Sequence, residues 1–201
     1  AAETPTPVLA PAEPALVNGQ LVYPGDKPVP RSMTPIERGW VERFGLGSGV
    51  GAGTDEPGTP PVGPVFCPGE YAPMQAIMVS WKGGTSLWQI LANMGARITT
   101  TGNAELWVAH TTAAERTDAT NRLTSAGANM SRVRFFNRAT DTIWIRDYGP
   151  RYIYEGGSLG VRSIVDHTYN RPRANDDALN RWLGPQLKHS VYGLPLVHGG
   201  G

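Results

Sequence analysis

Hydrophobic residues recur with two different periods along residues 74–201, and together they predict alternating strands and helices. Strands are expected at 75–81, 96–101, 104–109, 133–136, 142–148, 151–154, 159–166 and 191–197, and helices at 85–94, 112–126 and 176–187. The strand 75–81 is apolar almost throughout, which is typical of a strand that is buried on both faces. A hairpin turn is expected at Glu155-Gly156-Gly157. This alternation favours an α/β fold.

The first third of the chain has a different composition. Residues 1 to about 30 are rich in Pro, Ala and Val, which favours extended or polyproline conformations. Residues 47–64 form a linker of Gly, Pro and Thr. We therefore expect two parts, an N-terminal extension at 1–66 and a folded domain that occupies 67–201.

One short helix is predicted inside the extension, at 34–44. Thr34 is the expected N-cap, Pro35 occupies the first helical position, and Glu37 completes a capping box. Gly45 ends the helix. An apolar stripe recurs at four-residue spacing, formed by Ile36, Trp40 and Phe44. This stripe suits either of two roles, a cover for a missing half of the domain or a plug over a site.

Charge and composition exclude several classes of function. The net charge of +1 gives no electrostatic reason to expect nucleic acid or a membrane surface as a partner. No apolar run approaches the length of a membrane span. A single cysteine, Cys67, excludes an internal disulfide framework, and no histidine spacing suits a metal.

The chain begins with small residues, Ala1-Ala2-Glu3-Thr-Pro. They suit the mature side of a signal-peptidase cut, so we expect a secreted or periplasmic protein. The alternative is an artificial boundary of the expressed chain.

The chemistry is expected around the predicted strand 142–148. Trp144 and Arg146 would share one side of this strand, and a stiff turn follows at 149–150. Asp147, at the end of the strand, needs a cationic partner if it is buried. The neighbouring Arg146 is one candidate, and a ligand is the other.

Four stretches together resemble a known family. They are Trp144-Ile-Arg-Asp-Tyr-Gly-Pro150, Glu70 to Val79, Val165 to Asp177, and His198-Gly-Gly-Gly201. They are similar to the guanidine-modifying enzymes of the pentein fold, in particular the bacterial (Porphyromonas-type) peptidylarginine deiminase and agmatine deiminase family. The resemblance covers roughly residues 65–201. It implies a pentein α/β propeller, of which this chain holds the N-terminal modules only, and an activity that needs no cofactor.

The resemblance also implies roles for the central motif. Asp147 matches the carboxylate that binds the guanidinium, and two parallel hydrogen bonds would suit that planar cation. Trp144 matches the aromatic beside the aliphatic stem of the substrate, and Arg146 matches a residue that braces the site. The alternatives are an ion pair between Arg146 and Asp147 and a core position for Trp144.

Two arginines match the family residues that bind the carboxylate of a C-terminal arginine. They are Arg171 and Arg173, with Pro172 fixing the backbone between them. Gly200 lies in the matching glycine loop, where a small residue lets the backbone approach the substrate. The alternative is a solvated basic loop. The implied substrate is an arginine-containing peptide or protein, which would be converted to citrulline with release of ammonia.

The nucleophile of the family is not matched. Cys67 precedes the first predicted strand, and His198 does not correspond to the general acid, which lies in a later His-x-Asp motif. The resemblance therefore implies that the catalytic Cys and His belong to a C-terminal chain of the same precursor. Three explanations stay open for this protein: an enzyme nicked after Gly201, a truncated chain, or a degenerate, non-catalytic binding protein. Agmatine deimination and non-catalytic binding of arginine peptides are the alternative functions.

Overall fold

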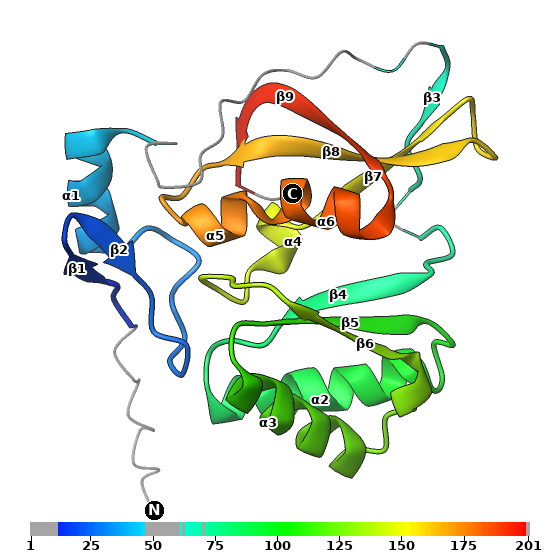
Figure 1. Cartoon of the computed structure of the whole chain (residues 1–201), viewed down its shortest axis with the longest axis horizontal. Helices are drawn as coiled ribbons and strands as arrows, with labels where there is room; N and C mark the ends of the chain where they lie inside the picture. The colour runs from blue at the N-terminus through cyan, green and yellow to red at the C-terminus, as the bar shows by residue number, and fades with distance from the viewer. Residues whose placement is uncertain (1–11, 47–60, 62, 70, 200–201) are drawn as a thin grey trace, which may run out of the picture.

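The computed structural model describes residues 12–46, 61, 63–69 and 71–199, which form three sheets with flanking helices (Figure 1). The strands are β1 Ala15–Val17, β2 Gln20–Val22, β3 Val65–Phe66, β4 Ala76–Ser80, β5 Glu105–His110, β6 Val133–Asn137, β7 Arg151–Glu155, β8 Val161–Tyr169 and β9 Ser190–His198. The helices are α1 Pro35–Phe44, α2 Thr85–Thr99, α3 Ala113–Ser125, α4 Ile145–Tyr148, α5 Ala174–Asp177 and α6 Leu179–Leu187, with a 3₁₀ turn at Met130–Arg132.

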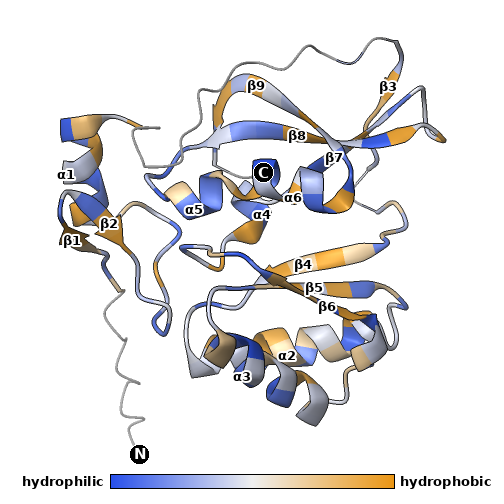
Figure 2. Ribbon diagram, viewed as in Figure 1, coloured by the Kyte–Doolittle hydropathy of each residue, from blue (hydrophilic) through white to orange (hydrophobic). Residues whose placement is uncertain are grey.

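The first sheet is parallel and has the order β4-β5-β6. Its central strand β5 is buried along almost its whole length, whereas β4, which was predicted to be buried on both faces, lies at the edge and is fully buried only at Val79 and Ser80. Helices α2 and α3 cover one face of this sheet (Figure 1). The core between them contains Trp81, Leu106, Val108 and Leu123, and hydrophobic positions gather on β4 to β6 and on α2 (Figure 2).

The second sheet has the order β3-β7-β8-β9. Strands β7 and β8 form the predicted antiparallel hairpin, with Gly156 and Gly157 at positive φ in the turn. The chain then crosses through α5 and α6 to β9, which lies parallel to β8. Helices α4, α5 and α6 lie between the two sheets (Figure 1). Trp107, Phe136 and Leu183 belong to the core that joins the two layers.

Two predicted strands are wrong. The segment 96–101 continues α2, because Ala92, Ala96 and Thr99 are buried at helical spacing against the first sheet. The segment 142–148 is not a strand but a loop that ends in the single turn α4. The predicted helix 176–187 is divided at Ala178 into α5 and α6. The other predicted strands and helices of 75–197 are confirmed within a few residues.

The described part of the extension forms a small unit of its own. Strands β1 and β2 pair around Asn18 and Gly19, both at positive φ, as a two-residue hairpin requires. Helix α1 has the predicted N-cap, capping box and Gly45 terminus. The Trp40 Nε1 donates to Gly19 O at 2.9 Å, which ties the helix to the hairpin.

The apolar stripe of α1 remains largely uncovered. Ile36 is 39% exposed and Phe44 43% exposed. The expected linker lies almost entirely outside the described residues. The division at 66–67 stays a prediction, although β3 already pairs with β7 from Val65 onward.

We predict that Gly95→Ala destabilises the protein. A Cβ atom on Gly95 would lie 2.5 Å from Leu123 Cδ2 and 2.7 Å from Leu106 Cδ2, both in a buried core. Overpacking costs about 1–3 kcal/mol, which exceeds the gain of about 1 kcal/mol in helix propensity. Urea unfolding should show a lower midpoint. Gly39→Ala in α1, where a Cβ meets open space, is the control and should not lower it. An equal rise of the urea midpoint in both variants would contradict the close packing around Gly95.

Candidate active site

The segment that carries Asp147 forms one helical turn instead of a strand. The Asp147 N–H donates to Trp144 O at 2.8 Å, and the Gly149 N–H donates to Ile145 O at 2.6 Å. A Cβ on Gly149 would lie 2.4 Å from Ile145 O, so only glycine fits this end of the turn. Pro150 follows, has no N–H to donate and starts the approach to β7. The expectation that Trp144 and Arg146 share one side of a strand is therefore wrong.

Asp147 is a buried carboxylate that is paired with an arginine. Its side chain is 6% exposed, and its Oδ2 accepts a hydrogen bond from Arg31 Nε at 2.8 Å. The carboxylate raises the pKa of Arg31 through this hydrogen bond and its charge. The cation that the sequence required is thus a guanidinium from the N-terminal extension, whereas Arg146 lies exposed on α4.

Buried carboxylates hold the irregular segment before α4. Asp176 accepts hydrogen bonds from the N–H groups of Asp141 and Thr142 and from the Thr142 hydroxyl. Asp141 in turn accepts from the backbone and side chain of Asn175. Burial and the neighbouring Asp141 raise the pKa of Asp176 well above its usual value. These contacts give a loop without regular structure the partners that its buried N–H groups need.

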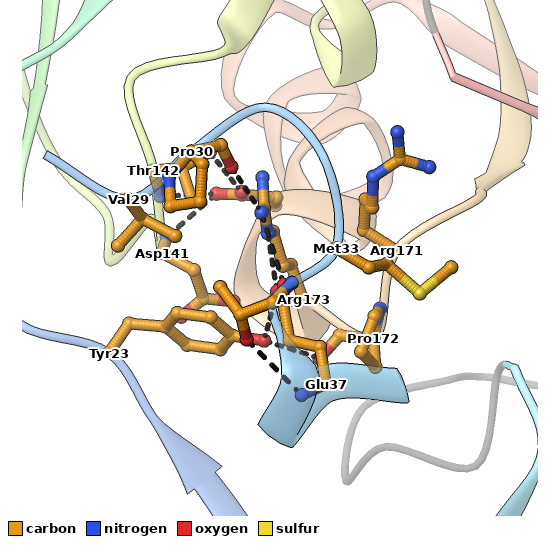
Figure 3. A network of polar contacts seen from close by, with 12 residues as sticks. Tyr23, Val29, Pro30, Met33, Glu37, Asp141, Thr142, Arg171, Pro172 and Arg173 are labelled. Carbon is orange, nitrogen blue, oxygen red and sulfur yellow. Dashed lines mark hydrogen bonds and ion pairs between the residues drawn. The ribbon is translucent and has the colours of Figure 1, made fainter. Parts of the chain in front are cut away.

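Arg173 is completely buried and forms the centre of a polar network (Figure 3). Its Nε donates to Glu37 Oε1 at 2.8 Å, and its Nη2 donates to Pro30 O at 2.6 Å. Burial acts to lower the pKa of Arg173, but Glu37 outweighs burial and raises it. The Tyr23 hydroxyl donates to Glu37 Oε1 and makes a second contact with Pro172 O.

Arg171 lies nearer the surface and makes a different set of contacts. Its Nε donates to Arg31 O at 2.9 Å, and its Nη1 donates to the backbone and side-chain oxygens of Asn170. The two predicted carboxylate-binding arginines thus flank the same piece of the extension. Neither is a solvated side chain of a basic loop.

Trp144 and the glycine loop complete this constellation. Trp144 packs against a cluster that contains Tyr148, Tyr169 and Leu179, and its Nε1 donates to Val29 O at 2.8 Å. Trp144 thus packs against this core cluster, as the alternative interpretation expected, and its role beside the stem of a substrate stays a prediction. Gly200 lies outside the described residues. Its neighbour Gly199 accepts a hydrogen bond from Arg31 Nη2 at 3.3 Å through its carbonyl oxygen.

The structure brings together Trp144, Asp147, Arg171 and Arg173 around the segment 29–31. Cys67 is an exposed free thiol just after β3. His198 lies 5.4 Å from His167, centroid to centroid. Burial lowers the pKa of His167, although a backbone hydrogen bond with Asp147 acts in the opposite direction.

Within residues 12–46, 61, 63–69 and 71–199, no group of three or more His, Cys, Asp or Glu side chains is arranged to hold a metal ion. Over the same residues, no helix combines the length and the apolar character of a membrane span.

The sequence did not identify Arg31 as a site residue. For Glu37 it predicted the capping contact but not the ion pair with Arg173. Arg31 stands in a Pro-rich leader with no motif around it, so no local signal could have identified it. Glu37 was expected only as part of a capping box. The capping box is present, with Thr34 N donating to Glu37 Oε2 at 2.7 Å, and the other carboxylate oxygen is left for Arg173.

Comparison with known proteins identifies the family of the chain. Residues 66–201, more than half of the chain, match the family described as Porphyromonas-type peptidyl-arginine deiminase. The chain belongs to this family. The resemblance that the sequence motifs indicated is therefore confirmed.

Solved structures of related deiminases share the fold. The agmatine deiminase of Enterococcus faecalis superimposes with a TM-score of 0.57 at 18% identity, over 68% of this chain and 40% of that one. The C. jejuni agmatine deiminase gives 0.53 at 20% identity, over 68% and 41%. A protein provisionally assigned as a peptidyl-arginine deiminase gives 0.55 at 22%, over 68% and 42%. These likenesses establish the pentein fold. The chain spans about two fifths of the length of these relatives.

The position of the constellation agrees with the general rule for α/β sheets. The motif follows the carboxyl end of β6, and ligands of open α/β sheets bind outside the carboxyl ends of the strands. A hollow of about 290 Å³ lies at the opposite, amino ends of β4 to β6, where Gln75, Glu105 and Arg134 line it. We therefore place the candidate site at Asp147 and not at this hollow.

We predict a pH-dependent stability difference for Asp177→Asn. Asp177 accepts a hydrogen bond from Tyr169 N, and burial raises its pKa to about 6. Between pH 4 and 6 the native state holds a proton that the unfolded chain has released, so this group makes stability fall as the pH rises.

An asparagine keeps the acceptor oxygen but does not titrate. The free energy of unfolding of Asp177→Asn, relative to wild type, should therefore rise by on the order of 2 kcal/mol from pH 4 to pH 7. Urea titrations at a series of pH values measure it. A difference that does not change with pH would refute the buried carboxylate.

Proposed function

We propose that the complete protein hydrolyses the guanidinium of peptidyl arginine to give citrulline and ammonia. The observation that carries this proposal is the pairing of the buried Asp147 with an arginine guanidinium, that of Arg31. A carboxylate with little access to water binds a cation far more strongly than an exposed one. Because the chain belongs to a deiminase family, a carboxylate that binds an arginine guanidinium is a candidate for binding the guanidinium of a substrate.

In this proposal Asp147 holds the substrate guanidinium and keeps its positive charge in place. A thiolate attacks the central carbon, ammonia leaves with a proton from a general acid, and water then displaces the thiolate to leave the ureido group. Guanidinium and water thus give a urea and ammonium. The nucleophilic Cys and the acid-base His are expected on a C-terminal polypeptide of the same precursor, as the family resemblance implies.

The backbone contacts of Arg171 and Arg173 favour a peptide as substrate. Both donate to main-chain carbonyl oxygens, those of Arg31 and Pro30. Agmatine has no carbonyl or carboxylate for them to bind. Deimination of agmatine, the activity named for two of the structural relatives, is the second candidate.

We predict that Asp147→Asn abolishes turnover by the full-length protein. The amide is neutral and presents N–H donors to a cation that offers only donors. Loss of one partner of a buried charge pair costs about 2–5 kcal/mol, so kcat/KM should fall by at least about 30-fold. Ammonia release from a C-terminal-arginine peptide measures it. Asp118→Asn in α3 is the control, since its amide oxygen can still accept from Trp81 Nε1.

We predict that Arg171→Ala separates the two substrates. Turnover of the peptide should show a KM about tenfold or more higher, because a charge-assisted hydrogen bond is lost, whereas turnover of agmatine should be unchanged. Arg97→Ala, on the exposed face of α2, should change neither. An equal loss with both substrates would contradict the peptide assignment. Binding that depends on Asp147 but releases no ammonia would identify a non-catalytic binding protein.

A further inference from the structure

The extension passes directly over the candidate site. Three consecutive carbonyl groups, those of Val29, Pro30 and Arg31, accept hydrogen bonds from Trp144 Nε1, Arg173 Nη2 and Arg171 Nε at 2.8, 2.6 and 2.9 Å. Figure 3 shows Val29 and Pro30 beside Arg173. The side chain of Arg31 reaches Asp147 at 2.8 Å and Gly199 O at 3.3 Å.

These partners are the residues that were expected to bind substrate. Asp147 accepts from a guanidinium, Arg171 and Arg173 donate to main-chain oxygens, and Gly199, the neighbour of Gly200, accepts from the same guanidinium. The segment 29–31 therefore occupies the site as a bound peptide would, with Arg31 in the place of the substrate arginine.

Contacts on both sides of this segment fix its position. Before it, Gly83 N donates to Gly25 O at 3.1 Å, and a Cβ on Gly84 would lie 2.3 Å from Asp26 O. After it, Glu37 forms the buried ion pair with Arg173. Pro28 and Pro30 restrict the backbone between these anchors, which lowers the entropy that is lost on docking.

The Arg31 end of the segment is the less buried part. The side chain of Arg31 is 53% exposed, while that of Asp147 is only 6% exposed. Because its side chain is half exposed, Arg31 regains its hydration when it leaves, and the main cost of its departure is the unpaired Asp147. Asp147 would then be a buried carboxylate in need of another cation, which an arginine from outside supplies.

We propose that Val29-Pro30-Arg31 is a built-in peptide ligand that competes with external arginine peptides for the guanidinium site. This inference rests on the proposed function of the site. The apparent affinity for substrate is the intrinsic affinity multiplied by the fraction of time for which the segment leaves the site free. Its displacement or removal opens the site.

The test compares wild type and Arg31→Ala as full-length proteins. Calorimetric titration with an acetylated peptide that ends in Gly-Arg measures binding, and ammonia release from the same peptide measures turnover. If the segment occupies the site nine-tenths of the time, Arg31→Ala should bind the peptide about tenfold more tightly. Arg38→Ala is the matched control, since Arg38 is exposed on α1 and donates to Met33 O. It should bind as wild type does.

A second arm supplies the segment as a separate molecule. A synthetic peptide that covers residues 26–33 should bind Arg31→Ala and compete with the Gly-Arg peptide. The same peptide with lysine in place of arginine should bind at least about tenfold more weakly, because lysine lacks the planar guanidinium fork.

The outcomes separate the two proposals. Equal affinity of wild type and Arg31→Ala for the Gly-Arg peptide, with turnover in both, would overturn the built-in ligand and leave the proposed function intact. Tighter binding by Arg31→Ala without ammonia release would support the built-in ligand and overturn the deiminase activity. No binding to any variant would overturn both.

Discussion

The buried ion pair between Glu37 and Arg173 is the contact on which the arrangement of this chain depends. Both side chains are completely buried, so each charge has lost its hydration and needs the other. Loss of one partner from such a pair typically costs about 3–5 kcal/mol. Glu37 belongs to α1 and Arg173 to the loop between β8 and α5. One interaction thus joins the extension to the pentein layers and positions the segment that carries Arg31.

Besides this contact with the extension, hydrogen bonds within the folded domain hold the site in place. The chain that leads from β6 to α4 has no regular structure. Asp176 accepts from two of its backbone N–H groups, those of Asp141 and Thr142, while Asp141 accepts from Asn175. Carboxylates with raised pKa values therefore act as structural acceptors next to Asp147, which acts as an acceptor for a guanidinium. The two sheets and their apolar cores supply a rigid support that does not involve the extension.

The sequence predicted most of what depends on local signals and little of what depends on distant contacts. Helix α1 was predicted to the residue, because its N-cap, capping box and terminal glycine are local. A strand was predicted at 96–101, but burial of Ala96 and Thr99 against the first sheet extends α2 instead. The motif identified Asp147 as a guanidinium carboxylate. Its partner Arg31 is 116 positions away, and no pattern near Arg31 indicates the contact.

The separation between Glu37 and Arg173, 136 positions, has a consequence for biosynthesis. At elongation rates of about 5–20 residues per second, roughly 7–27 s pass between the synthesis of the two side chains. Glu37 already has a local partner during this delay, because the capping box gives its carboxylate the Thr34 N–H. The sheet of β4 to β6 can form in the same interval. The extension is therefore made before the pentein layers and can dock on them only after Arg173 has been made.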